Sequence, residues 1–264
     1  MFQRRANRST AELVTALLEG SERATAHHVD LDALDQLPPP VARYFRHVLP
    51  DRRPFIRVAR LEQVGTLRTN IRSRRWSSFT ARQIVVPGSP GFVWDARVTI
   101  LPLLHLRVRD AYVGGTGSGR VSVFTGITLA ADSGRPELDS GALHRYLAEG
   151  AWYPTALLPG PALRWSPLST TKAVATLTNA GLTVSLEFWF NDTGEITGVY
   201  SPGRWGRFDG GYQLTPWEGH FRNYQERDGM LIPCEGEVGW YTRPEWECVW
   251  RGRTVEVDYE PTEF

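Results

Sequence analysis

The sequence predicts a mainly β protein of the α+β class, in which N-terminal helices precede a large antiparallel sheet that is curved or rolled into a half-open barrel. Apolar and polar side chains alternate in many short runs after residue 55, which is the period of strands. These runs follow one another with few helices between them, which favours antiparallel pairing. Ten tryptophans in 264 residues, most of them inside such runs, require an enclosed apolar volume.

Residues 1–50 are predicted to be helical. Ser9 or Thr10 can cap a first helix that has Glu12 close behind and ends at Gly20. Pro38 lies where a first-turn proline is tolerated, ahead of a second helical stretch. We therefore expect a helical segment over residues 1–50 and an antiparallel β domain over residues 51–264.

The β domain is predicted to contain twelve strands, each with boundary errors of about 2–4 residues. Hairpin turns are expected at residues 191–194 and 251–253 because both segments combine glycine with polar residues. The expected strands are 56–69, 74–86, 92–100, 104–113, 119–128, 171–178, 182–190, 195–201, 211–224, 230–241, 246–252 and 254–259.

One helix is expected to interrupt the strands. Residues 139–150 begin with the capping residue Asp139, carry apolar side chains at helical spacing and end at Gly150. The following residues, 152–160, are apolar but broken by prolines, so we expect them to pack over the core or to close a cavity as a lid. The inserted helix and lid thus occupy residues 139–160.

Composition excludes several classes of partner. Thirty basic and twenty-nine acidic residues leave a net charge of +1 without an extended basic stripe, so we expect no nucleic acid. The apolar run after Arg8 belongs to an amphipathic helix, and no run approaches the roughly 18 apolar residues of a membrane span, so neither a signal peptide nor integral membrane association is expected. These features predict a cytoplasmic protein.

No metal or cofactor is predicted. The histidines are scattered without ligand spacing, and the glycines of residues 114–119 do not match a dinucleotide fingerprint. Cys234 and Cys248 lack the spacing of a redox pair or of a zinc site. Two interpretations remain for them, reduced cysteines in the core or a bridge between paired strands.

Six short motifs are spread over the chain: LPPPVARYF at 37–45, WSSFTARQ at 76–83, PGFVWDA at 90–96, RYLAE at 145–149, WYPTALLPG at 152–160 and RW at 164–165. In their order and spacing they resemble an uncharacterised bacterial family of unknown function, and the similarity covers roughly residues 37–260. The resemblance implies a half-open barrel like that of the lipoprotein carriers, an antiparallel sheet curled round apolar contents, without implying their periplasmic role.

Two carboxylates are candidates for acid or base chemistry. Alternation puts Asp110 on an otherwise apolar strand face, where it is either the structural partner of an arginine such as Arg97 or Arg109, or an acid placed in a pocket. Glu149 stands at the C-terminal end of the inserted helix, where the dipole does not favour it. It either pairs with Arg145 at the surface or points under the lid as a general acid or base.

The aromatic residues indicate an interior that is filled either by its own rings or by a guest molecule. The leading hypothesis is a protein that encloses a lipid-like or polyketide-like molecule. The alternative is a cofactor-independent cyclase or isomerase acting in the same pocket through Asp110 or Glu149. A scaffold that docks another protein through an exposed aromatic edge is a third possibility. The predicted ligand-binding residues are Trp94, Arg97, Tyr112, Trp152, Tyr153, Trp189, Trp217 and Tyr224.

Overall fold

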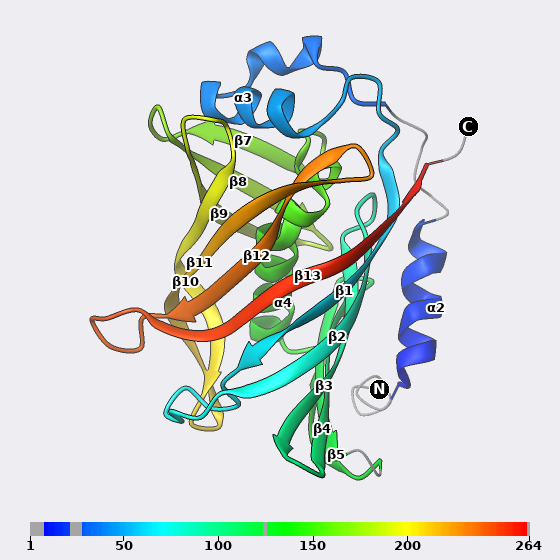
Figure 1. The fold of residues 1–264 in the computed structure, drawn as a ribbon, viewed down its shortest axis with the longest axis vertical. Helices are drawn as coiled ribbons and strands as arrows, with labels where there is room; N and C mark the ends of the chain where they lie inside the picture. Colours follow the sequence, from blue (N-terminus) through cyan, green and yellow to red (C-terminus); the bar gives the residue numbers. More distant parts are fainter. Residues whose placement is uncertain (1–7, 22–27, 124–125, 263–264) are drawn as a thin grey trace.

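The computed structural model describes residues 8–21, 28–123 and 126–262. Within these ranges, thirteen strands form one antiparallel sheet in the order β6-β5-β4-β3-β2-β1-β13-β12-β11-β10-β9-β8-β7. Strands adjacent in the chain are adjacent in the sheet except β6 and β7, which lie at opposite edges. At the centre, β1 (Ile56–Leu67) pairs with β13 (Glu247–Pro261). The sheet curls round a concave face, with β6 and β7 as its two edges (Figure 1). The predicted half-open, mainly β fold is confirmed.

The two halves of the sheet are each an up-and-down series of hairpins. The first half continues from β1 with β2 (Ser77–Val86), β3 (Gly91–Leu101), β4 (Leu104–Val113), β5 (Thr116–Val123) and β6 (Thr128–Ser133). The second half comprises β7 (Leu163–Pro167), β8 (Lys172–Asn179), β9 (Leu182–Phe190), β10 (Ile196–Phe208), β11 (Gly211–Arg227) and β12 (Met230–Trp240) before β13.

The predicted turn at residues 251–253 is wrong, because β13 runs through it and joins the two strands expected at 246–252 and 254–259. Gly252 lies opposite Gly65 of β1, and a Cβ atom on Gly65 would come within 2.0 Å of the carbonyl oxygen of Arg251. Glycine therefore marks a close approach of two strands here. The turn at residues 191–194 is confirmed between β9 and β10. The edge strands β6 and β7 were missed, because the strand expected at 119–128 corresponds to β5 and no further strand was expected before residue 171.

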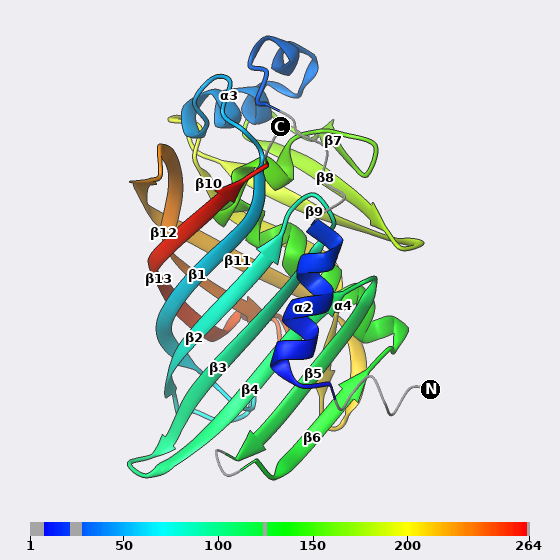
Figure 2. The same ribbon diagram turned by 90° about the vertical axis from the view of Figure 1, so that its right-hand side faces the viewer.

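Helix α2 (Thr10–Ser21) covers the outer face of the sheet and has the predicted cap. The backbone N–H of Ser9 donates to Glu12 across 2.6 Å, and the N–H of Glu12 donates to the Ser9 hydroxyl across 3.2 Å, which forms a capping box. Leu13 and Leu17 are buried against β1, β2, β3 and β4, on the face opposite the concave one (Figure 2).

Helix α3 (Pro39–Val48), preceded by the 3₁₀ helix η1 (Asp32–Gln36), packs at one end of the sheet near β8 and β12. Its Tyr44 and Phe45 are completely buried in the main core. No helix in the described part of the chain is both long and apolar enough to cross a membrane. The division of the chain at residue 50 stays a prediction.

Helix α4 (Pro136–Ala148) lies inside the curve and links the two edge strands (Figure 1). It begins three residues before the predicted start because Pro136 occupies its first turn, where a missing N–H costs nothing. A Cβ atom on Gly141 would lie 2.9 Å from the carbonyl oxygen of Trp205, so this glycine lets α4 approach β10 closely. The helix thus fills part of the volume that the sheet encloses.

The apolar segment expected as a lid continues α4 as two 3₁₀ turns, η2 (Glu149–Trp152) and η3 (Pro154–Leu157). Trp152, Tyr153 and Leu157 are at most 4% exposed, so the segment belongs to the core. The concave face, α3, α4 and these turns form one continuous apolar cluster.

Candidate functional site

Arg145 of α4 stands at the centre of a polar group inside the curve. Its Nε donates to Oε1 of Glu149 across 2.7 Å, and its Nη1 lies 3.1 Å from Oδ2 of Asp110 on β4. The guanidinium carbon is 4.9 Å and 5.0 Å from the ring centres of Phe92 and Trp94 on β3. Burial opposes the charge of Arg145, but the two carboxylates outweigh it and raise its pKa. Arg145 therefore stays cationic among aromatic rings.

Glu149 is held from two sides. Besides the bond from Arg145, its Oε2 accepts a hydrogen bond of 2.6 Å from Nε2 of Gln83, a buried residue of β2. The Glu149 side chain is only 12% exposed. The predicted pair with Arg145 is thus present, but it lies inside the concavity instead of on a solvated surface.

Asp110 has a different partner from those expected. The sequence interpretation paired it with Arg97 or Arg109, but its ion-pair partner is Arg145. Arg97 is exposed, and Nη1 of Arg109 donates to the backbone oxygen of Arg8 beside α2. Neighbouring residues of one strand alternate between faces, so Arg109 cannot follow Asp110 onto the concave face. The observed partner, Arg145, lies on helix α4, which comes later in the chain than the strand that carries Asp110.

An aromatic cavity of about 270 Å³, here called the tryptophan cavity, lies beside this group. The aromatic part of its wall is Trp94, Trp152, Trp217, Phe221, Trp240 and Trp250. Its polar and charged members are Arg68, Asp110, Arg145, Glu149, Arg204, His220 and Glu237. The indole N–H of Trp94 donates to Oε1 of the buried Gln63 across 3.0 Å. The buried indole N–H groups of Trp152 and Trp217 have no acceptor among the described residues.

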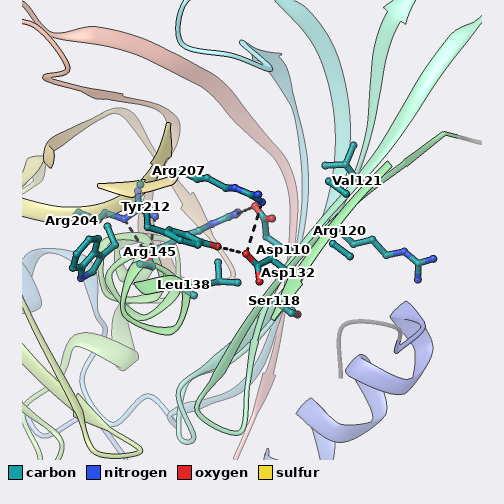
Figure 3. Close-up of a pocket in the computed structure, with 18 of the residues that line it drawn as sticks. Asp110, Ser118, Arg120, Val121, Asp132, Leu138, Arg145, Arg204, Arg207 and Tyr212 are labelled. Carbon is teal, nitrogen blue, oxygen red and sulfur yellow. Dashed lines mark hydrogen bonds and ion pairs between the residues drawn. The ribbon is translucent and has the colours of Figure 1, made fainter. Parts of the chain in front are cut away.

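A second cavity of about 290 Å³, the charged cavity, adjoins the first. Asp110, Asp132, Arg145, Arg204, Arg207 and Tyr212 supply its polar lining (Figure 3). The Tyr212 hydroxyl donates to Asp132 across 3.0 Å; burial and this bond raise the pKa of Tyr212 to about 12. Although burial opposes it, the bonds from Tyr212 and Arg135 lower the pKa of Asp132. Asp110, Arg145, Arg204 and Trp240 line both cavities.

Arg204 of β10 lies where the two cavities meet. Its guanidinium carbon is 4.7 Å from the ring centre of Trp217 and 5.1 Å from that of Trp240. Its Nε and Nη2 both donate to the carbonyl oxygen of Gly141 on α4, across 3.3 Å and 3.0 Å. In the described ranges no carboxylate lies within ion-pair distance of it. Burial and the like charge of Arg145 lower the pKa of Arg204 to about 10.

The predicted ligand-binding residues divide into three groups. Trp94, Trp152 and Trp217 line the tryptophan cavity. Tyr112, Tyr153 and Tyr224 are packed in the core outside both cavities, and the hydroxyl of each donates a hydrogen bond within the protein. The acceptor is Asn179 for Tyr112, the carbonyl oxygen of Tyr146 for Tyr153 and the carbonyl oxygen of Ile196 for Tyr224. Next to Tyr224, Asn223 has a φ of 59°, so the backbone of β11 is irregular at the point where the predicted alternation fails.

Trp189 and Arg97 lie on the outer face of the sheet. Trp189 stacks against Tyr200 with ring centres 6.4 Å apart, and the amine of Lys172 is 4.6 Å from its ring centre. Its strand neighbour Phe188 is the one that enters the core. The alternation had separated these faces correctly, but it could not say which of them is concave.

Three polar residues of the interior were missed. Gln63 and Gln83 occupy inward positions of β1 and β2, a signal present in the alternation Leu61-x-Gln63 and Ala81-x-Gln83. Arg204 was missed because the predicted strand ended at residue 201. Pro202 and Gly203 mark a bulge there, after which β10 continues to Phe208.

Cysteine and metal chemistry add nothing to this site. Cys234 and Cys248 are both free and buried, so the bridged alternative is wrong. Burial raises the pKa of both thiols. In residues 8–21, 28–123 and 126–262, no group of three or more His, Cys, Asp or Glu side chains is arranged to hold a metal ion.

Comparison with known proteins identifies the relatives of the chain. The sequence matches no curated protein. In structure it resembles a LolA superfamily protein from Nitrosomonas europaea, with a TM-score of 0.43 and 10% identity over 89% of this chain and 96% of the other. The model of a family of unknown function, DUF6544, matches residues 27–252, which include every residue of the two cavities. The chain therefore belongs to the DUF6544 family of unknown function.

Proposed function

We propose that the protein binds a hydrophobic small molecule, lipid-like or polyketide-like, in the tryptophan cavity. The observation that carries this proposal is the cavity itself: six aromatic side chains surround about 270 Å³ that they do not fill. The cavity is partly open to the outside, as a ligand-binding cleft must be. Unfilled space walled by indole rings favours an apolar guest.

The size of the cavity limits the guest. A volume of about 270 Å³ lies near the lower end of the roughly 300–1,000 Å³ of ordinary ligand pockets. A compact molecule or one end of a longer chain fits this volume. The charged cavity shares four lining residues with it, so a longer guest has a second compartment to enter.

A glycine in the wall allows a direct test. Gly236 of β12 lines the tryptophan cavity, and a Cβ atom there would be 3.5 Å from the Trp152 ring, an ordinary contact. Gly236→Leu is therefore expected to fill the cavity while leaving the strand intact. Gly211→Leu is the matched control, because Gly211 lies on β11 outside both cavities and a Cβ there would meet nothing closer than 3.9 Å.

The measurement is native mass spectrometry of the purified protein, together with titration of the neutral dye Nile red. Wild-type protein and Gly211→Leu are expected to carry a hydrophobic molecule or to bind the dye, and Gly236→Leu to lose both. If wild-type protein neither retains a molecule nor binds the dye, or if Gly236→Leu binds as well as wild type, the proposed function fails.

A cyclase or isomerase acting in the same space is the second candidate. One observation favours it: Asp110 lines both cavities, and its Oδ1 has no hydrogen-bond partner among the residues described. That oxygen is free to exchange a proton with a bound molecule. Once the ligand is known, Asp110→Asn and Glu149→Gln test this reading. Conversion of the ligand by wild type and not by Asp110→Asn supports it, and no conversion by any of the three contradicts it.

A further inference from the structure

We infer that the ligand of the tryptophan cavity is an amphiphile with a carboxylate head, and that Arg204 binds this head where the two cavities meet. This inference rests on the proposed function and adds the chemical class of the guest. It follows from a comparison of the two arginines that line both cavities.

The charge of Arg145 is already offset by two carboxylates. Its guanidinium is already bonded to Glu149 and paired with Asp110, and the other oxygen of Glu149 accepts from Gln83. Asp110 and Glu149 are therefore engaged with Arg145. An anionic guest at Arg145 would meet the repulsion of these two carboxylates.

Arg204, in contrast, has no carboxylate within ion-pair distance among the described residues. A guanidinium has five N–H donors, and two of its nitrogens, Nε and Nη2, share a single acceptor, the Gly141 carbonyl. Its Nη1 donates to no group within the described part of the chain. Nη1 is not among the buried unpaired atoms of the structure, so its N–H groups remain accessible to a ligand that supplies oxygen atoms.

The aromatic surroundings favour a planar carboxylate in particular. The guanidinium carbon lies over the rings of Trp217 and Trp240, and Nη1 is the nitrogen on the guanidinium edge that donates to no described residue. A carboxylate matches that edge with two parallel hydrogen bonds. The pKa of Arg204, although lowered to about 10, leaves it charged at neutral pH, and its burial strengthens attraction to an anion.

The rest of the tryptophan cavity suits the hydrocarbon part of such a guest. Trp152 and Trp217, both at most 4% exposed, line it together with Arg204. The other aromatic members of the wall extend this apolar surface away from the arginine.

The test compares four probes that share one alkyl chain: dodecanoate, methyl dodecanoate, dodecanol and dodecyltrimethylammonium. Binding is followed by tryptophan fluorescence and calorimetry below the micellar concentration. Wild-type protein is expected to bind dodecanoate most tightly. Arg204→Gln is expected to weaken dodecanoate roughly tenfold to a hundredfold, the usual range for a charge-assisted hydrogen bond, and to change the neutral probes less than about twofold. Arg204→Lys keeps the positive charge but lacks the paired N–H donors of a guanidinium. Its affinity for dodecanoate should therefore lie between those of wild type and Arg204→Gln.

Arg82→Gln is the matched control, because the Arg82 side chain is 83% exposed and lies outside both cavities. Circular dichroism and thermal unfolding verify that each variant is folded. If dodecanoate and the neutral probes bind alike, if Arg204→Gln weakens all of them equally, or if the ammonium probe binds best, the carboxylate assignment is wrong while the proposed function stands. If none of the four binds wild-type protein, the proposed function itself fails.

Discussion

The Arg145 guanidinium and the Glu149 carboxylate are joined by a hydrogen bond of 2.7 Å inside the curve of the sheet, four residues apart on the last turn of α4. Gln83 holds the second oxygen of the same carboxylate from β2. This pair therefore ties the inserted helix to the first half of the sheet, and Asp110 on β4 adds a second tie.

Removing the cation should destabilise the fold. Arg145→Met leaves Glu149 partly buried without its ion-pair partner, and breaking a buried pair typically costs about 3–5 kcal/mol. Because the two side chains are 20% and 12% exposed, we expect a smaller loss in the free energy of unfolding, about 2–3 kcal/mol, by urea denaturation. Arg82→Met, which breaks the exposed pair with Glu62, should change it by less than about 1 kcal/mol. Equal losses in the two variants would contradict the structural role of Arg145.

The close contact of α4 with β10 depends on a missing side chain. Gly141→Ala would force a Cβ atom to within 2.9 Å of the Trp205 carbonyl oxygen, and overpacking typically costs about 1–3 kcal/mol. We expect a loss of that size in thermal or urea unfolding. Gly160→Ala is the control, since nothing lies within 4 Å of a Cβ there, and it should be neutral. A Gly141→Ala protein as stable as wild type would mean that the helix can shift freely.

Stability should fall in mild acid because of a buried histidine. His144 on α4 is 7% exposed, and burial, together with the charge of Arg204, lowers its pKa from 6.5 to about 4. Between these pH values the unfolded chain binds a proton that the folded chain does not, so the free energy of unfolding decreases as pH falls from about 6.5 towards 4. The decrease should be roughly 2 kcal/mol between pH 7 and pH 4.5. His144→Gln should show a clearly smaller decrease, and an unchanged slope would refute the assignment.

Neither cysteine should react in the folded protein. Cys234 and Cys248 are 2% and 8% exposed, and burial raises the pKa of both, so little thiolate is available at neutral pH. With a thiol-reactive disulfide reagent, we expect labelling to be at least about a hundredfold slower in buffer than in urea, the thiolate being the reactive form. Fast labelling of both thiols in buffer would show that β12 and β13 open readily.

The sequence predicted much of this fold because the two-residue period survives wherever a strand is regular. It predicted the cap of α2 and the turn after Phe190. It failed at Gly252, where the same residue type that makes turns instead makes room for Gly65. A glycine in an alternating run is compatible with a turn or with a close approach of two strands, and only the position of the partner strand distinguishes the two cases.

The candidate site was predicted less completely, for a different reason. The alternation of side chains along strands and the position of the inserted helix identified five residues that do line the cavities: Trp94, Trp152, Trp217, Asp110 and Glu149. The contacts that organise them join elements far apart in the chain, such as Arg145 with Asp110. The alternation of side chains shows which residues share a face of a strand, whereas the curvature of the sheet decides which face encloses space. Trp189 illustrates the limit, because its face proved to be the outer one.

The junction of β1 with β13 has a consequence for biosynthesis. Val58 lies opposite Glu260, so the middle of the sheet is formed by residues about two hundred positions apart. During translation the two series of hairpins can each form from local contacts, but they can join only after the last strand has left the ribosome. Contacts of such long range form slowly. Until they form, the nascent chain exposes two unpaired strand edges, which is when it most needs protection from aggregation.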